Sequence, residues 1–295
     1  MSNKFRLSLG GEINRTERVS FKFNGKTFFG FKGDTLASAL IGNGVHLVGR
    51  SFKYHRPRGF LGSGSEEPNA IVQIIKDKAR TEPNIRATEI EIFEGFEAKS
   101  QNCWPSVNFD VGEINNFLSP LLPAGFYYKT FMWPAKLWKT YEYFIRKSAG
   151  LGVSATERDP DLYDHKYYHC DVLIVGSGPA GITAASIAVK SGKKVLLVDE
   201  KADHGGSLVG SDSELTKIND GTPKDWVNKT FSNLSKNKNI KILNRTSVAA
   251  YHNYNYLIMV QNLTDHLNEE EKKNKIRQRL WKVRARKVIL ATGSI

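Results

Sequence analysis

The segment of this sequence best suited to bind a ligand is a glycine-rich turn, Gly176-Ser177-Gly178-Pro179-Ala180-Gly181. Gly176 would permit a tight turn, Gly178 would let the backbone approach a pyrophosphate, and Gly181 would let the next helix pack close to a sheet. The free N–H groups at the start of that helix would face the phosphates. Because the turn follows an expected strand and opens an expected helix, a dinucleotide site is favoured over a turn needed only for packing.

Two carboxylates, Asp199 and Glu200, end the next expected strand, and Glu200 lies 24 residues after Gly176. A carboxylate here accepts hydrogen bonds from the adenosine ribose and repels a 2′-phosphate, so NAD or FAD is favoured over NADP. Adjacent strand residues point to opposite faces, so only one can take this role. We assign it to Glu200 and keep Asp199 in the candidate site, although a solvated or helix-capping carboxylate is the simpler interpretation. The following Gly205 and Gly206 could let backbone amides approach the cofactor.

The sequence contains no motif for acid–base, nucleophilic or metal chemistry. Its seven histidines are scattered, and neither a zinc-binding histidine pair nor a phosphate-binding lysine motif is found. Two cysteines, Cys103 and Cys170, cannot form a disulfide framework or a four-thiolate metal site, and both are most simply buried thiols. We therefore predict no catalytic residue and no metal ligand in this chain.

Residues 170–295 alternate strands and helices, which predicts a Rossmann-type FAD- or NAD(P)-binding domain. A strand at 171–175, the glycine-rich turn, a helix of small residues and a strand at 193–200 form a βαβ unit. Further elements are expected at 223–236 (helix), 240–244 (strand), 249–262 with 279–285 (antiparallel ribbon) and 287–295 (strand). Since a doubly wound sheet normally continues past such a strand, we expect this domain to be incomplete, truncated at its C-terminal end.

Residues 1–99 predict a small β-grasp domain of ferredoxin type, so the whole chain is assigned to the α/β class. Apolar and polar residues alternate from 19 to 31 around an Asn-Gly pair, as is typical of a β-hairpin. Asp34 can cap the helix that follows, and Gly42 or Gly44 can end it. A long loop then leads to an apolar strand that begins at Ala70.

The long loop has no ligands for an iron–sulfur cluster. The plant-type spacing C-x4-C-x2-C places Leu61, Glu66 and Asn69 where thiolates are needed. Three glycines remain, as expected of a loop that kept its shape without the metal: Gly59, Gly62 and Gly64. A basic run precedes them and could bind an anion or an acidic partner, or form internal ion pairs: Arg50, Lys53, His55, Arg56 and Arg58.

Residues 100–169 are predicted to be an aromatic-rich extension and linker. The tryptophans, tyrosines and prolines of this stretch would pack on their own domain or form an inter-subunit surface. Residues 136–150 predict a short amphipathic helix that ends at Gly150. The polar residues 155–166 are the expected linker between domains.

Composition excludes several classes of protein. With 40% hydrophobic and 25% charged residues among 295, the chain is globular rather than disordered or fibrous. No apolar stretch approaches the ~20 residues that cross a bilayer. The N-terminus lacks a signal-peptide pattern, so we expect a cytoplasmic protein without a membrane partner.

The net charge of +13 is spread along the chain, and residues 269–279 mix acids with bases as in a solvated hairpin or loop. Docking on an acidic subunit therefore fits better than binding nucleic acid.

Five segments closely resemble the N-terminal part of the alpha subunit of heterotetrameric sarcosine oxidase: residues 33–40, 47–59, 64–70, 123–134 and 157–181. The resemblance implies a subunit of a complex that oxidatively demethylates sarcosine to glycine, with hydrogen peroxide and formaldehyde, or methylene-tetrahydrofolate, as products. The partners would be beta, gamma and delta subunits. FAD and FMN would be held mainly through the beta subunit, and the tetrahydrofolate site would lie outside this sequence, which alone would lack oxidase activity.

The same resemblance implies that this chain binds NAD as a structural ligand rather than a hydride donor. The residues that it assigns to NAD are Gly176, Gly178, Gly181 and Glu200, with Gly205, Gly206 and Ser207 nearby. Two other functions stay open. One is the alpha subunit of a related oxidoreductase for an opine, dimethylglycine or proline, although such subunits usually keep the cluster cysteines. The other is a non-enzymatic nucleotide-binding scaffold, since no catalytic group is found.

Overall fold

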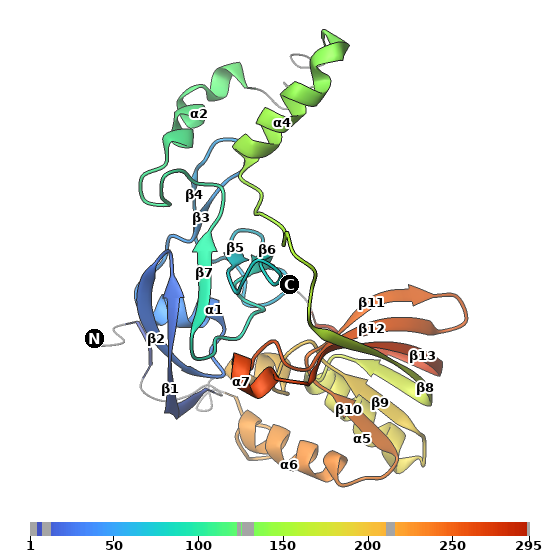
Figure 1. Ribbon diagram of the computed structural model, residues 1–295. Coiled ribbons are helices and arrows are strands. Elements are labelled where there is room, and N and C mark those ends of the chain that lie inside the picture. The colour runs from blue at the N-terminus through green and yellow to red at the C-terminus, as the bar shows by residue number, and fades with distance from the viewer. Residues whose placement is uncertain (1–4, 8–12, 123–124, 126–132, 211–215, 294–295) are drawn as a thin grey trace. The chain divides into compact units, whose positions relative to one another are not determined.

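The computed structural model describes residues 5–7, 13–122, 125, 133–210 and 216–293, and the chain divides into two compact units (Figure 1). The first unit comprises Met1–Arg6 and Asn14–Pro160. The second unit comprises Leu7–Ile13 and Asp161–Ile295. Each unit has its own sheet and its own hydrophobic core.

The first unit contains the expected β-grasp domain. Its mixed sheet has the order β2-β1-β7-β5-β6, with strands β1 (Asn14–Phe23), β2 (Lys26–Lys32), β5 (Ile71–Ile74), β6 (Glu82–Arg86) and β7 (Phe96–Ser100). The Asn24-Gly25 pair forms the β1–β2 turn with φ of 51° and 75°, values that suit the twist of a hairpin. Helix α1 (Leu36–Gly42) buries Leu36 and Leu40 against aromatic side chains of the sheet. The sequence prediction of this fold is confirmed.

The cap of helix α1 differs from the prediction by one residue. Thr35, not Asp34, is the N-cap, and its side chain accepts a hydrogen bond from the Ser38 amide. Asp34 is fully buried and accepts hydrogen bonds from both terminal nitrogens of Arg6, at 2.9 and 2.8 Å, and from the Phe31 amide. This long-range ion pair competes with capping, and local spacing does not reveal it. Gly42 is the last helical residue, and of the two glycines predicted to end the helix in the left-handed conformation it is Gly44 that adopts it, at φ 77°.

The rest of the first unit is a ribbon and a series of short helices. Their bounds are β3 (Gly49–Arg50), β4 (Pro57–Arg58), η1 (Val111–Glu113), α2 (Ile114–Phe117), η2 (Ser119–Leu121), η3 (Ala135–Leu137) and α4 (Trp138–Ala149). Helix α4 ends at the left-handed Gly150, as predicted, and buries none of its residues. Most of the aromatic segment 123–134 lies outside the described residues. Among the described residues of the first unit, several large apolar side chains are exposed, including Trp104, Phe109, Phe117 and Phe144.

The second unit is a Rossmann-type α/β domain, as predicted. Its six-stranded sheet has the order β10-β9-β8-β13-β12-β11, with strands β8 (Leu162–Val175), β9 (Val195–Val198), β10 (Ile240–Leu243), β11 (Thr246–His252), β12 (Tyr256–Asn262) and β13 (Ile276–Leu290). Strands β10, β9, β8 and β13 are parallel. Helices α5 (Pro179–Lys190) and α6 (Pro223–Ser235) lie on one face (Figure 1), where Ile182, Ala185 and Val227 join a buried cluster.

Two segments of the second unit correct the sequence predictions. Residues 162–169, expected in the linker, form the first half of β8 because they pair with β13 from Leu162 to Cys170. An ion pair of 2.7 Å joins Asp164 to Arg279 across these strands. Residues 269–279, expected as a solvated hairpin or loop, include the helical turn α7 (Glu269–Lys272) and the start of β13. An Asn268 capping box stabilises that turn.

Candidate dinucleotide-binding site

The glycine-rich turn lies at the point where the order of the parallel strands reverses. It leaves the carboxyl end of β8, which has β9 and β10 on one side and β13 on the other. Ligands of open α/β sheets bind in the crevice at such a switch point. The Gly176 amide donates to Val198 O and the Ala291 amide to Val175 O, which fixes the turn to both neighbouring strands.

Three glycines of the turn have different tasks. Gly176 is left-handed at φ +100°, and a Cβ there would collide with the backbone of Ala291. A Cβ on Gly181 would collide with the carbonyl group of Gly176, so this glycine permits helix α5 to pack against the turn. A Cβ on Gly178 would meet only the Cα of Gly206, at 3.9 Å. Gly178 therefore borders open space, as a residue that faces a ligand must.

The turn fits a pyrophosphate. Gly206 is left-handed at φ +54°, and a Cβ on it would lie 2.9 Å from the Gly178 Cα, so the two turns are in close backbone contact and only glycine fits at this position. We call the glycine-lined surface that Gly178 and Gly206 border, next to the start of α5, the cradle. Gly178 is the N-cap of α5, and because glycine has no side chain it cannot accept a hydrogen bond from the first amides of the helix. Pro179, at the first helical position, needs no hydrogen-bond acceptor. The amides of Ala180 and Gly181 have no intrahelical acceptor in the first turn and are positioned to bind phosphate oxygens.

Asp199 holds the glycine-rich turn in place. Its Oδ2 accepts hydrogen bonds from the amide and the hydroxyl of the fully buried Ser177, at 2.5 and 2.7 Å, and its Oδ1 accepts from the Lys201 amide at 2.9 Å. The interpretation of Asp199 as a solvated or helix-capping carboxylate is therefore wrong. Strand β9 ends at Val198, so Asp199 and Glu200 lie in a turn and not on opposite faces of a strand. Glu200 is exposed beside it.

The second glycine turn is joined to the first through Ser177. The Gly205 amide donates to Ser177 O at 2.9 Å, and His204 Nδ1 lies 3.1 Å from Ser177 Oγ. Because the Ser177 hydroxyl donates to Asp199, its oxygen can accept a hydrogen bond from the Nδ1–H of a neutral His204. The His204 ring stacks on Phe231 with centroids 3.5 Å apart. Burial lowers the pKa of His204 to about 4, although Asp199 acts in the opposite direction.

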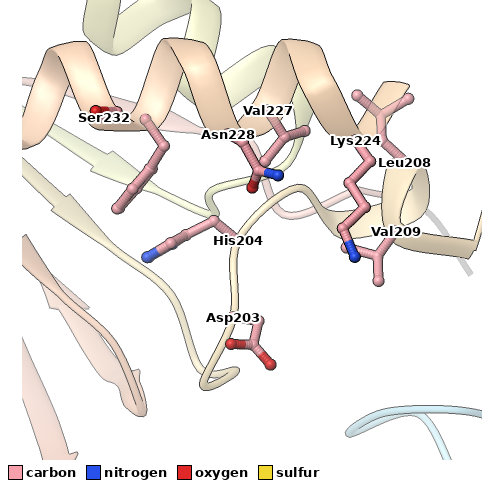
Figure 2. Close-up of a pocket in the computed structure, with 9 residues that line it drawn as sticks. Asp203, His204, Leu208, Val209, Lys224, Val227, Asn228 and Ser232 are labelled. Carbon is pink, nitrogen blue, oxygen red and sulfur yellow. The ribbon is translucent and has the colours of Figure 1, made fainter. Parts of the chain in front are cut away.

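A pocket of about 250 Å³ adjoins this second turn (Figure 2). It lies between α6, η4 (Gly206–Gly210), which includes Ser207, and the residues before η4. Figure 2 shows His204 and Asp203 on one side and α6 on the other. The lining residues are Asp203, His204, Leu208, Val209, Lys224, Val227, Asn228, Phe231 and Ser232.

The sequence motifs did not predict the roles of His204 and Ser177, because the contact between these two residues joins turns that are 27 residues apart in the chain.

The two thiols are poor nucleophiles. Burial raises the pKa of Cys170 to about 11, with Lys194 acting in the opposite direction and Asp171 raising it. Burial and the Asp110 carboxylate raise the pKa of Cys103, which is half-buried rather than buried as predicted. Within residues 5–7, 13–122, 125, 133–210 and 216–293, no group of three or more His, Cys, Asp or Glu side chains could hold a metal ion.

Two members of the basic run are used inside the first unit. The buried Arg50 donates to the carbonyl oxygens of Val107 and His55 and pairs with Glu113 at 3.2 Å. The buried His55 lies 2.6 Å from Asp110. These contacts favour internal pairing over an anion site for Arg50 and His55.

Two protein-family models match the chain. Residues 171–287 match an FAD dependent oxidoreductase model, and residues 16–103 match a 2Fe-2S iron-sulfur cluster binding domain. The second unit fits a dinucleotide because the start of α5 adjoins the glycine-lined cradle that Gly178 and Gly206 border. The first unit does not fit the iron–sulfur cluster, because a buried carboxylate, Glu67, takes up the amides of the loop in which the thiolates would be needed.

Known proteins are similar to nearly the whole chain. The sarcosine oxidase subunit alpha of Rhizobium meliloti (strain 1021) is 46% identical over 293 residues, 99% of this chain and 29% of the relative. That of Corynebacterium sp. (strain P-1) is 34% identical over 97% of this chain and 25% of the relative. The chain thus spans less than a third of the length of these relatives.

A solved structure shows the same fold. The L-proline dehydrogenase from P. horikoshii matches with a TM-score of 0.56 and 19% identity, over 96% of this chain and 42% of that chain. Its match extends across both units, so the order of a β-grasp domain followed by a Rossmann-type domain occurs in a known protein. In the part of the chain that the structure describes, no helix has the length and apolar character needed to span a membrane.

Proposed function

Since the chain is homologous to sarcosine oxidase alpha subunits along nearly all of its length, we propose that it is the nucleotide-binding part of such a subunit. The observation that carries the proposal is the 46% identity over 99% of this chain. The complex would oxidatively demethylate sarcosine to glycine and produce hydrogen peroxide with formaldehyde or methylene-tetrahydrofolate. The tetrahydrofolate would bind outside these residues.

The ligand that we propose for the second unit is NAD. The amides of Ala180 and Gly181 would bind the pyrophosphate in the cradle that Gly178 and Gly206 border, and the exposed Glu200 would accept hydrogen bonds from the adenosine ribose. When bound, NAD would have a structural role, and substrate oxidation would use flavins held elsewhere. Asp199 would support the site through Ser177 without touching the ligand.

The partners that we propose are the beta, gamma and delta subunits, with FAD and FMN held mainly through the beta subunit. Two features support a large partner surface. Phe117 is 90% exposed and Trp104 is 71% exposed, and aromatic side chains are enriched where proteins contact one another. The net charge of +13 favours an acidic partner.

One reconstitution experiment tests the oxidase proposal. The chain is expressed together with the flavin-containing subunits of its host, and sarcosine-dependent oxygen uptake is measured with and without it. We expect turnover only when the chain is present. Faster turnover with dimethylglycine, proline or an opine would move the assignment to a related amine oxidoreductase. Full turnover without the chain would leave only a nucleotide-binding scaffold.

A second measurement identifies the nucleotide. The purified chain is denatured, and the released nucleotides are separated by chromatography. We expect NAD in an amount close to that of the protein. Because the matched family model is described as FAD dependent, recovery of FAD from the chain alone would correct the ligand while leaving the dinucleotide site in place.

A further inference from the structure

The loop between β4 and β5 is built around a buried carboxylate. Glu67 is 0% exposed. Its Oε2 accepts hydrogen bonds from the amides of Leu61 and Gly62, both at 2.6 Å. Its Oε1 accepts from the amides of Asn69 and Ala70, at 2.6 and 3.1 Å. Four backbone amides of one loop therefore converge on a single anion.

These hydrogen bonds keep the carboxylate ionised. Burial raises the pKa of Glu67, but the amides of Asn69, Leu61, Gly62 and Ala70 lower it by more, so the pKa lies below its ordinary value of 4.5. A carboxylate that accepts several backbone N–H bonds is stabilised in its charged form even without a neighbouring cation. At neutral pH the loop therefore encloses a negative charge.

Neighbouring groups fix the shape of the same loop. Glu66 Oε1 accepts hydrogen bonds from the amides of Ser63 and Gly64, at 2.7 and 2.9 Å. The buried Thr88 hydroxyl donates to Gly64 O at 2.7 Å, and Arg86 Nε donates to Glu67 O at 3.1 Å. The loop is thus stabilised by its own glutamate side chains and by hydrogen bonds from Arg86 and Thr88, which lie at and after the end of β6.

In a cluster-binding loop of this kind, an iron–sulfur cluster is the anion enclosed by the loop. Its thiolates and sulfides are anionic, and hydrogen bonds to the sulfurs tune the cluster. Here the positions that need thiolates are Leu61, Glu66 and Asn69, and the amides of Leu61 and Asn69 point instead to the Glu67 carboxylate. Residues 16–103 match a cluster-binding model, but the anion inside the loop is the Glu67 carboxylate and not a cluster.

We propose that the Glu67 carboxylate is the resident anion of this loop and takes the structural place of an iron–sulfur cluster. The four amides form an anion site that the chain fills with its own side chain. Removal of that side chain leaves an anion site that a small carboxylate such as formate can enter. This proposal concerns the first unit and does not depend on the proposed oxidase function.

The first test compares Glu67→Gln with Glu66→Gln in the full chain. Glu66 belongs to the same loop and also accepts two amide bonds, but it is exposed, which makes it a matched control. We expect Glu67→Gln to raise the unfolding equilibrium constant at pH 7 by about 100-fold or more, because buried donors lose a charged acceptor. Glu66→Gln should change it by less than about tenfold. Equal effects of the two substitutions would overturn the proposal.

The second test is chemical rescue of Glu67→Ala. Urea unfolding of the variant and of the unsubstituted chain is followed in sodium formate and in sodium chloride at equal ionic strength. We expect formate to raise the urea midpoint of the variant more than that of the unsubstituted chain, because formate binds only where the amides are unfilled. An equal response of both proteins to formate would overturn the anion site. If Glu67→Ala does not fold, recovery of folding in formate is scored instead, and its absence leaves the Glu67→Gln comparison to decide.

Acid supplies a third readout. Since the folded pKa of Glu67 lies below 4.5, its contribution to stability is present above that pH and is lost as the pH falls through the folded pKa. The difference in unfolding free energy between the unsubstituted chain and Glu67→Gln should be constant from pH 6 to 8 and decrease below about pH 4.5. A difference that does not decrease in acid would overturn the role of the charge.

Discussion

The adjacent carboxylates Asp199 and Glu200 have different surroundings, so we expect one to stabilise the glycine-rich turn and the other to bind the ligand. Asp199 is occupied by the amide and hydroxyl of Ser177 and by the Lys201 amide. Glu200 is exposed in the turn that follows strand β9. One carboxylate therefore shapes the turn, which leaves the other as the candidate for the ribose.

The substitution Glu200→Ala tests this division. We expect the affinity for NAD to fall by about 1.5 to 3 kcal/mol, the worth of a charge-assisted hydrogen bond, while the unfolding free energy stays within about 0.5 kcal/mol. Titration calorimetry and urea unfolding measure the two quantities. Unchanged affinity would show that the ribose is bound by other groups, such as backbone amides.

His204 predicts a pH dependence of stability. Its folded pKa of about 4 lies below the ordinary 6.5, so the unfolded chain binds the proton first and stability is lost as the pH falls from 6.5 to 4. The loss from this residue is at most about 3.5 kcal/mol. His204→Phe keeps a ring that can stack on Phe231, and we expect it to flatten this part of the pH profile. A pH profile that His204→Phe leaves unchanged would contradict this assignment.

At the scale of elements, the turn between β8 and α5 contains one glycine that the fold requires and another that we expect to serve ligand binding. A Cβ on Gly181 would meet the carbonyl group of Gly176, whereas a Cβ on Gly178 would have no neighbour nearer than 3.9 Å. Gly178 also has an ordinary φ of −72°. The same small substitution should therefore have opposite consequences at these two positions.

We expect Gly178→Ala to fold with nearly unchanged stability and to bind NAD at least about tenfold more weakly, because the methyl group narrows the pyrophosphate cradle. Gly181→Ala should lose about 2 kcal/mol or more of stability, because helix α5 must move away from the turn. Urea unfolding and NAD titration of both variants provide the comparison. A Gly178→Ala protein with full NAD affinity would contradict the assignment of the cradle.

The elements with local signals were predictable from the sequence, and those that depend on distant partners were not. The Asn24-Gly25 hairpin, the end of α4 at Gly150 and the βαβ unit around the glycine-rich turn follow from turn chemistry and periodicity. The first half of β8 is polar, and its strand conformation depends on pairing with β13, more than a hundred residues away.

The candidate site shows the same limit. The glycines and the acidic pair were found from their spacing, but the division of tasks between Asp199 and Glu200 depends on Ser177, whose contacts no motif describes. Likewise, the missing cluster ligands were visible at Leu61, Glu66 and Asn69. The anion that fills the loop was not, because Glu67 is one of two adjacent glutamates and only the fold decides which is buried.

At the scale of the whole molecule, the two units have separate cores. The first unit buries Phe21, Phe23 and Phe96 around helix α1. The second buries Leu173 and Leu196 on one face of its sheet, with a further cluster beneath α5 and α6 on the other. A ligand that binds one unit stabilises the fold of that unit directly.

This arrangement predicts two transitions in the calorimetric unfolding of the chain. NAD at about a hundred times its dissociation constant stabilises the unit that binds it by about 2.7 kcal/mol, which corresponds to roughly 10 °C for a domain of this size. We expect NAD to raise only one transition and Glu67→Gln to lower only the other. Gly178→Ala should abolish the NAD shift while leaving the effect of Glu67→Gln intact. A single transition that responds to both changes would mean that the units unfold as one cooperative structure, and an NAD shift in the transition lowered by Glu67→Gln would place the nucleotide in the first unit.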